Sequence, residues 1–173
     1  AVHLFGLCAD VIRLREVLPE HVRIVEDAAC AAGAKLHGRY AGGLGDIAVF
    51  SFHPRKTITT GEGGMVTTYD GALARRVAAL RNHAIDAFGG DRAETAPHSL
   101  PDIEEVGFNY RMTDLQAAIG LVQLGKLEAI IAERSSRAAY YRDALDQISW
   151  LRVPRQFPGY GHGWQAFVTL IDD

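Results

Sequence analysis

The chain has 173 residues, of which 48% are hydrophobic and 23% charged, as is typical of a globular protein that buries one sizeable core. Its formal net charge of −3 gives no reason to expect a nucleic acid or an anionic membrane as a partner. No apolar run approaches the ~18 residues that a membrane-spanning helix needs. The two cysteines have neither metal-site nor disulfide spacing, which favours a reducing cytoplasm and no metal.

The first part of the chain predicts alternating strands and helices. Residues 1–5 form an apolar run typical of a strand, and Asp10 can cap a helix that continues to about Leu18. Residues 22–25 predict a second strand, which ends in Glu26 and Asp27 and is followed by an alanine-rich helical turn at 28–33. Strands and helices that alternate with short connections indicate a parallel α/β sheet.

Asp27 lies where the second predicted strand ends. Its carboxylate can cap the alanine-rich turn, and it can also point into the crevice at the carboxyl ends of the strands; the two roles are compatible. Cys30 lies in the same turn without a neighbouring base in the sequence. We therefore expect a small, buried apolar side chain there rather than a nucleophile.

A lysine in a glycine-rich loop is the most distinctive feature of the sequence. Residues 35–46 contain four glycines and predict a loop, and residues 47–52 predict a buried strand. Residues 51–64, SFHPRKTITTGEGG, combine Lys56 with hydroxyl side chains and glycines, in a chain with only three lysines. Because backbone amides and hydroxyls in such a loop can approach an anion, we expect a small anionic ligand there.

The remainder of the chain is predicted to be mainly helical. Residues 65–69 predict a strand, and Asp70 can cap a helix with an apolar stripe. Residues 83–106 predict a long loop that covers a site, reaches a partner or is disordered. Residues 113–116, TDLQ, predict a capping box for a long helix with a break near Gly125. A change in composition divides the chain into a large domain, residues 1–147, and the start of a small C-terminal domain, residues 148–173.

Lysine, aspartate and phosphate donors on one α/β sheet suit pyridoxal 5'-phosphate. The lysine amine can form a Schiff base, an aspartate can keep the pyridine nitrogen protonated, and the hydroxyls of Ser51 and the threonines can hold the phosphate. A nucleotide-phosphate loop is an alternative, but the sequence lacks both Gly-x-x-x-x-Gly-Lys-[Ser/Thr] and Gly-x-Gly-x-x-Gly, and Lys56 precedes its glycines. On residue types alone, pyridoxal phosphate is one hypothesis among several.

Longer motifs resemble those of a known family. The segments EDAA at 26–29, GD at 45–46 and FSFHPxKxITTGEGG at 50–64 are similar to the sugar-nucleotide aminotransferases of the DegT/DnrJ/EryC1/StrS family. The segments NYRMTDLQAA at 109–118 and QL at 123–124 resemble the same family. The resemblance extends over nearly the whole chain.

This resemblance implies a pyridoxal-phosphate-dependent homodimer of fold type I, whose mostly parallel sheet carries helices on both faces. It implies that Lys56 is the Schiff-base lysine and proton shuttle and that Asp27 contacts the pyridine nitrogen. Ser51 would hydrogen-bond the phosphate, and Asn109 would reach the phosphate bound by the other subunit. Cys30 stands where relatives usually carry Gln or His against the cofactor ring, so the stacking there is reduced.

The implied reaction is the transamination of a keto-sugar nucleotide. The lysine motif resembles that of enzymes aminating C4 of 4-keto-6-deoxy sugars, with glutamate as amino donor and Lys56 moving the proton, in polysaccharide or glycoconjugate biosynthesis. Relatives that act as dehydratases carry histidine in place of the lysine, and Lys56 argues against that branch.

The ends of the sequence indicate an internal piece of a longer chain. There is no initiator Met, both ends lie in predicted strands, and the family's upstream phosphate anchor and most of its small domain are absent. Three hypotheses follow: the catalytic core of a sugar-nucleotide aminotransferase, a truncated non-catalytic remnant of one, or a phosphate-binding α/β module without covalent chemistry.

Overall fold

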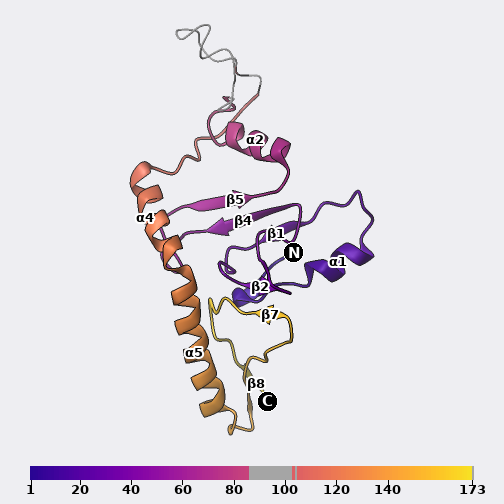
Figure 1. The fold of residues 1–173 in the computed structure, drawn as a ribbon, viewed down its shortest axis with the longest axis vertical. Coiled ribbons are helices and arrows are strands. Elements are labelled where there is room, and N and C mark those ends of the chain that lie inside the picture. The colour runs from indigo at the N-terminus through magenta and orange to yellow at the C-terminus, as the bar shows by residue number, and fades with distance from the viewer. Residues whose placement is uncertain (86–102, 104, 173) are drawn as a thin grey trace.

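A three-stranded sheet lies at the centre of the computed structural model, which describes residues 1–85, 103 and 105–172 (Figure 1). Its strands are β1 (Val25–Asp27), β4 (Ile47–Ser51) and β5 (Gly64–Thr67), in the order β1-β4-β5. β1 is parallel to β4, and β5 is antiparallel to it. The predicted strand at 22–25 is thus shifted, because the sheet pairing begins only at Val25.

The N-terminal residues join this sheet at one point rather than as the predicted strand. Val2 forms an isolated parallel bridge with Asp27, and Leu4–Gly6 then form a short 3-10 helix, η1. Phe5 and Gly6 have φ angles of 59° and 97°, which turn the chain away from the sheet. Helix α1 (Val11–Val17) follows, and the side chain of Asp10 caps it as predicted.

Residues 28–46 depart from prediction in two ways. Residues 28–33 form successive hydrogen-bonded turns instead of a helical turn, and Gly33 closes them at a φ of 82°. The predicted loop at 35–46 contains a hairpin of β2 (Lys35–Leu36) and β3 (Arg39–Tyr40). Strand β7 (Tyr160–Gly161) pairs with the other edge of β2, so the C-terminal segment completes a second sheet, β3-β2-β7.

The predicted helices after the central sheet are confirmed. The Asp70 side chain caps α2 (Gly71–Leu80), on which the apolar stripe is half-buried, and the Thr113–Gln116 capping box starts α4 (Asp114–Gly125). Helix α5 (Leu127–Leu145) follows after a bend of 55°, close to the predicted break. Most of the loop predicted at 83–106 lies outside the described residues.

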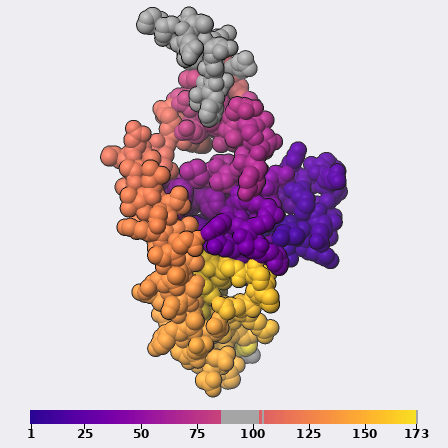
Figure 2. Space-filling model, viewed as in Figure 1, coloured from indigo at the N-terminus to yellow at the C-terminus, as the bar shows by residue number. Residues whose placement is uncertain are grey.

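The C-terminal segment packs back onto the rest of the chain. After α5, β6 (Leu151–Arg152) pairs antiparallel with β8 (Leu170–Ile171). Figure 2 shows this segment, in yellow, against α5 and the N-terminal half. Among the described helices none alone has the length and hydropathy to cross a membrane; α4 and α5 reach both only when counted together across their bend.

A buried carboxylate organises the turns beside the sheet. Glu26, in the middle of β1, is completely buried and accepts hydrogen bonds from the backbone N–H groups of Gly42, Leu44 and Gly45. Its Oε2 also lies 2.8 Å from Nε2 of His3. Burial raises the pKa of Glu26, but the hydrogen bonds from His3 and the three amides outweigh this and lower it below its ordinary value.

The tautomer of His3 follows from its two contacts. Nδ1 of His3 accepts a hydrogen bond from the backbone N–H of Ala9 at 3.0 Å. Nε2 therefore carries the proton, and its N–H donates a hydrogen bond to Glu26. This buried pair therefore connects the segment before α1, the central strand β1 and the glycine-rich turn at 42–45.

Replacement of Glu26 by Gln tests this network. We expect the free energy of unfolding at pH 7 to fall by roughly 2–4 kcal/mol, because an amide cannot accept all four hydrogen bonds. Because the pKa of Glu26 is lowered on folding, the carboxylate stabilises the fold above about pH 4.5, and this contribution is lost as the pH falls through the folded pKa. Urea unfolding should therefore show that the difference in free energy of unfolding between wild type and E26Q narrows as the pH falls from 7 to below 4.5. The control E16Q, at an exposed position, should unfold like wild type at pH 7 and below pH 4.5.

Candidate active site

The amine of Lys56 lies at the carboxyl end of β4. The chain leaves β4 at Ser51 and forms an irregular loop, residues 52–63, before it returns as β5. Lys56 is half-buried in this loop, and its backbone N–H donates to the carbonyl of His53 at 2.9 Å. Its Nζ donates to Sγ of Cys30 at 3.2 Å. Because Cys30 belongs to the turn after β1, the contact joins the loops that follow two parallel strands.

Asp27 is the last residue of β1 and lies at the same edge of the sheet. It pairs with Val49 of β4 and is exposed, while Oδ1 accepts from the backbone N–H of Ala29 at 3.0 Å. This hydrogen bond has the form of the cap that the sequence predicts. Ser51 lies two residues beyond Val49, and its Oγ accepts from the N–H of His53 at 3.4 Å. Asp27, Ser51 and Lys56 thus come from the edge at which parallel sheets usually bind ligands.

Asn109 occupies a different part of the fold. It forms an isolated antiparallel bridge with Asn82, just after α2, and its side chain is exposed. Hydrogen bonds of its neighbours Phe108 and Tyr110 to the α2 end hold it there. The described contacts do not connect it to the Lys56 loop, and its predicted role toward a second subunit stays a prediction.

The threonine hydroxyls of the lysine loop serve the loop itself. The sequence predicts them as phosphate donors, but Thr57, Thr59 and Thr60 each donate to a protein oxygen. The acceptors are Oε1 of Gln165 at 3.1 Å, the carbonyl of Phe52 at 2.8 Å and the carbonyl of Glu62 at 2.8 Å. These hydroxyls therefore hold an irregular loop in one conformation, and of the predicted phosphate donors Ser51 remains a candidate.

Gln165 contacts the lysine loop although no sequence pattern predicts it. Its side chain bonds to residues on both sides of Lys56, although it lies more than a hundred positions later in the chain. A single glutamine in a loop carries no local pattern, so only the folded structure reveals it.

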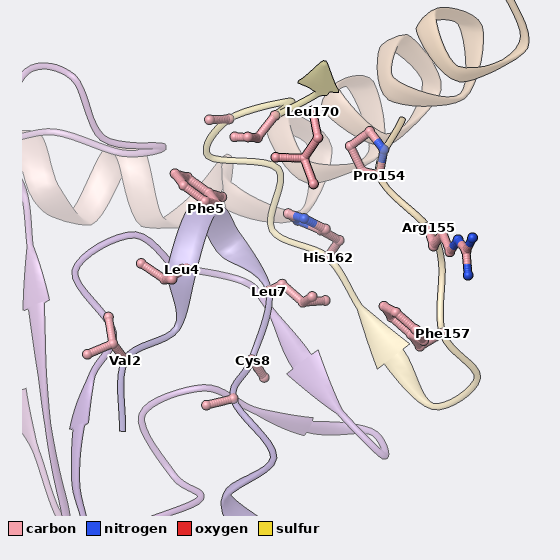
Figure 3. Close-up of a pocket in the computed structure, with 13 residues that line it drawn as sticks. Val2, Leu4, Phe5, Leu7, Cys8, Pro154, Arg155, Phe157, His162 and Leu170 are labelled. Carbon is pink, nitrogen blue, oxygen red and sulfur yellow. The ribbon is translucent and has the colours of Figure 1, made fainter. Parts of the chain in front are cut away.

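A separate apolar pocket of about 430 Å³ lies between the N-terminal and C-terminal segments (Figure 3). Apart from Cys8, Arg155 and His162, its lining is aliphatic or aromatic, and it contains none of the five predicted site residues. Burial lowers the pKa of His162 to about 4, so the imidazole is neutral at pH 7. We therefore place the candidate active site at Lys56 rather than in this pocket.

The two cysteines differ in a way that tests the placement of Cys30. Burial, and secondarily the charge of Glu26, raise the pKa of Cys8 to about 11, whereas Cys30 is half-buried in the turn that faces Lys56. Iodoacetamide at pH 8 should alkylate Cys30 at least ~10-fold faster than Cys8, because the thiolate is the reacting species. Peptide mass spectrometry measures both rates, and in urea they should converge. Equal rates in the folded chain would show that Cys30 is not placed as described.

Comparison with known proteins identifies the family. The sequence pattern of the DegT/DnrJ/EryC1/StrS aminotransferase family matches residues 1–173. The chain is 42% identical over 148 residues to the GDP-perosamine synthase of Caulobacter vibrioides. This alignment covers 85% of this chain and 37% of that protein.

Comparison with solved structures also finds aminotransferases. An aminotransferase from Psychrobacter cryohalolentis superposes with a TM-score of 0.89 at 33% identity, over 98% of this chain and 46% of that one. DesI, solved in the presence of its TDP-sugar product, gives a TM-score of 0.83 at 35% identity, over 99% of this chain and 41% of DesI. The chain therefore spans less than half the length of these relatives, and its fold is that of the fold type I pyridoxal-phosphate enzymes, as the family resemblance implies. The expected mostly parallel sheet is not what the described strands form: β1 and β4 pair in parallel, whereas the other named strand pairs are antiparallel. The chain belongs to the DegT/DnrJ/EryC1/StrS aminotransferase family.

Proposed function

We propose that this chain supplies the lysine-bearing part of a pyridoxal-phosphate-dependent aminotransferase that acts on a keto-sugar nucleotide. The observation that carries the proposal is the position of the Lys56 amine, 3.2 Å from Cys30, where the loops after β4 and β1 meet. Aminotransferases of this family depend on pyridoxal phosphate, and the family membership makes a sugar aminotransferase the expected activity.

The donor set of the site fits this cofactor. Lys56 offers an amine for covalent attachment, Asp27 an exposed carboxylate and Ser51 a hydroxyl, all at one sheet edge. When bound, pyridoxal phosphate would act as the electron sink of the reaction. The negative charge of Asp27 would keep the pyridine nitrogen protonated, and Nζ of Lys56 would carry the proton to and from the substrate carbon. Cys30 would lie beside the ring and Ser51 near the phosphate.

The substrate part of the proposal draws on the relatives. One is a GDP-perosamine synthase and another was solved with a TDP-sugar product, which supports a sugar nucleotide as substrate here. Glutamate as amino donor, a 4-keto-6-deoxy sugar and a cytoplasmic location belong to the same proposal. A phosphate-binding module without covalent chemistry is less well supported, because the threonine hydroxyls of the loop are bonded within the protein.

A homodimer with a shared site is also part of the proposal. Large apolar side chains are exposed along α4, among them Leu115 at 80% and Leu121 at 73%, and Tyr110 just before it is 73% exposed. Such a surface is typical of one that another chain covers. A second copy seated there would bring Asn109, which precedes α4, close to an interface.

Labelling with the cofactor tests the assignment of Lys56. Incubation with pyridoxal phosphate and reduction with borohydride should label Lys56 in preference to Lys35 and Lys126, because only Lys56 lies at the sheet edge beside Asp27 and Ser51. Peptide mapping locates the label. K56R should lose it and the control K126R should keep it. A label on another lysine, or none at all, would reject the assignment.

Substitution of Asp27 by Asn separates its role from that of Lys56. We expect amino transfer in the full-length protein to slow by roughly 100-fold or more, since a neutral amide no longer favours the protonated ring nitrogen. Labelling of Lys56 should persist, because the amine does not depend on that charge. D143N, an exposed change on α5, should transfer normally. Normal transfer by D27N would remove Asp27 from the proposed site.

A further inference from the structure

We infer that Gln165 is a positioning residue for Lys56, through which the C-terminal segment holds the loop that carries the amine. The inference rests on the proposed function in so far as Lys56 is taken as the reactive lysine. The hydrogen bonds of Gln165 lie within this chain and do not depend on the proposed function.

The side-chain amide of Gln165 bonds to both neighbours of Lys56 in the sequence. Its Nε2 donates to the carbonyl oxygen of Arg55 at 2.6 Å, and its Oε1 accepts from the hydroxyl of Thr57 at 3.1 Å. Thr57 is only 6% exposed, so its hydroxyl needs a protein partner. With one donor and one acceptor used, the planar amide holds the backbone carbonyl of Arg55 and the side-chain hydroxyl of Thr57 in one orientation, one on each side of Lys56.

Gln165 is itself held from two directions. On one side, Nη1 of Arg134 in α5 donates to the carbonyl of Trp164 at 2.7 Å. On the other side, the N–H of Gly163 donates to Gly6 at 2.7 Å and the N–H of Ala166 to Phe5 at 3.2 Å. The glutamine is therefore anchored to α5 and to η1, and it can act as a fixed point for the loop.

The close approach to η1 requires glycine at position 6. A Cβ on Gly6 would lie 2.8 Å from the backbone nitrogens of both Trp164 and Gln165, and its φ of 97° disfavours other residues. The indole of Trp164 is 5% exposed and stacks on His162 at 3.9 Å, which adds a rigid contact beside the glutamine.

The lysine loop needs such an anchor. Residues 52–63 form no regular structure, and a lysine side chain is long and flexible, so the backbone at 55–57 decides where the amine can reach. The amine meets Cys30 on one side of the loop and Gln165 holds the backbone beside it. Since Gln165 lies in the segment that we propose as the start of the small domain, the position of that segment is coupled to the position of the amine.

Competitive acetylation of the cofactor-free full chain tests the inference. Acetic anhydride should acetylate Lys56 slowly in the wild type, because the amine is half-buried against Cys30, and the exposed Lys126 serves as the reference. Q165A removes both hydrogen bonds and should raise the ratio of acetylated Lys56 to acetylated Lys126 at least roughly fivefold, the effect expected for the loss of even one of them. T57V, which removes one of the two bonds, should raise it by less. Peptide mass spectrometry gives the ratio.

Matched variants separate positioning from general destabilisation. Q156A, at an exposed glutamine of the same segment, should leave the ratio at its wild-type value, and the ratio of Lys35 to Lys126 should stay constant in Q165A. If Q165A does not fold, the isosteric Q165E carries the same expectation, since a carboxylate cannot donate to the Arg55 carbonyl. An unchanged Lys56 ratio in a folded variant, or an equal rise at Lys35, would overturn the inference.

The result of the acetylation experiment does not depend on the result of labelling with pyridoxal phosphate. A wild-type chain whose Lys56 is not labelled by pyridoxal phosphate would refute the proposed function. The acetylation ratio would still report whether Gln165 holds the loop. Conversely, normal labelling of Lys56 in wild type with an unmoved acetylation ratio in Q165A would retain the function and reject the positioning role.

Discussion

The parallel pairing of β1 with β4, in one register, is the constraint on which the site depends. It sets Asp27 opposite Val49 and places the turn that carries Cys30 next to the loop that carries Lys56. Successive side chains of a strand point to opposite faces, so the same register buries Glu26 while it exposes Asp27. A slip by one residue would turn Glu26 outward and separate its carboxylate from the backbone N–H groups of the 42–45 turn.

Two sets of polar contacts support this arrangement. In the interior, the buried pair of His3 and Glu26 holds the N-terminal segment and the glycine-rich turn against β1. At the open edge, Cys30 meets the amine of Lys56, and Gln165 holds the backbone around it. The lysine loop therefore has a defined conformation without secondary structure of its own, which is what a reactive side chain on a loop requires.

What could be predicted from sequence follows from the range of the interactions involved. The caps at Asp10, Asp70 and Thr113 involve groups within three residues of one another, and each was predictable from local pattern. The hairpin at 35–40 was missed because its turn, His37 and Gly38 with φ angles of 47° and 79°, lacks the usual Asn-Gly signal, and because its second partner strand lies far along the chain. The 3-10 helix was missed because a non-glycine residue, Phe5, adopts a positive φ.

The candidate site likewise has a part that is predictable from sequence and a part that is not. The lysine motif is contiguous and carries a family resemblance, whereas Gln165 bonds to it from 108 and 110 positions away and has no local sequence pattern.

Transfer of isotopically labelled nitrogen from glutamate to a keto-sugar nucleotide by the full-length protein is the decisive measurement. We expect the label in the sugar product of the wild type and none with K56R; nitrogen transfer that continues without the Lys56 amine would contradict the proposed chemistry.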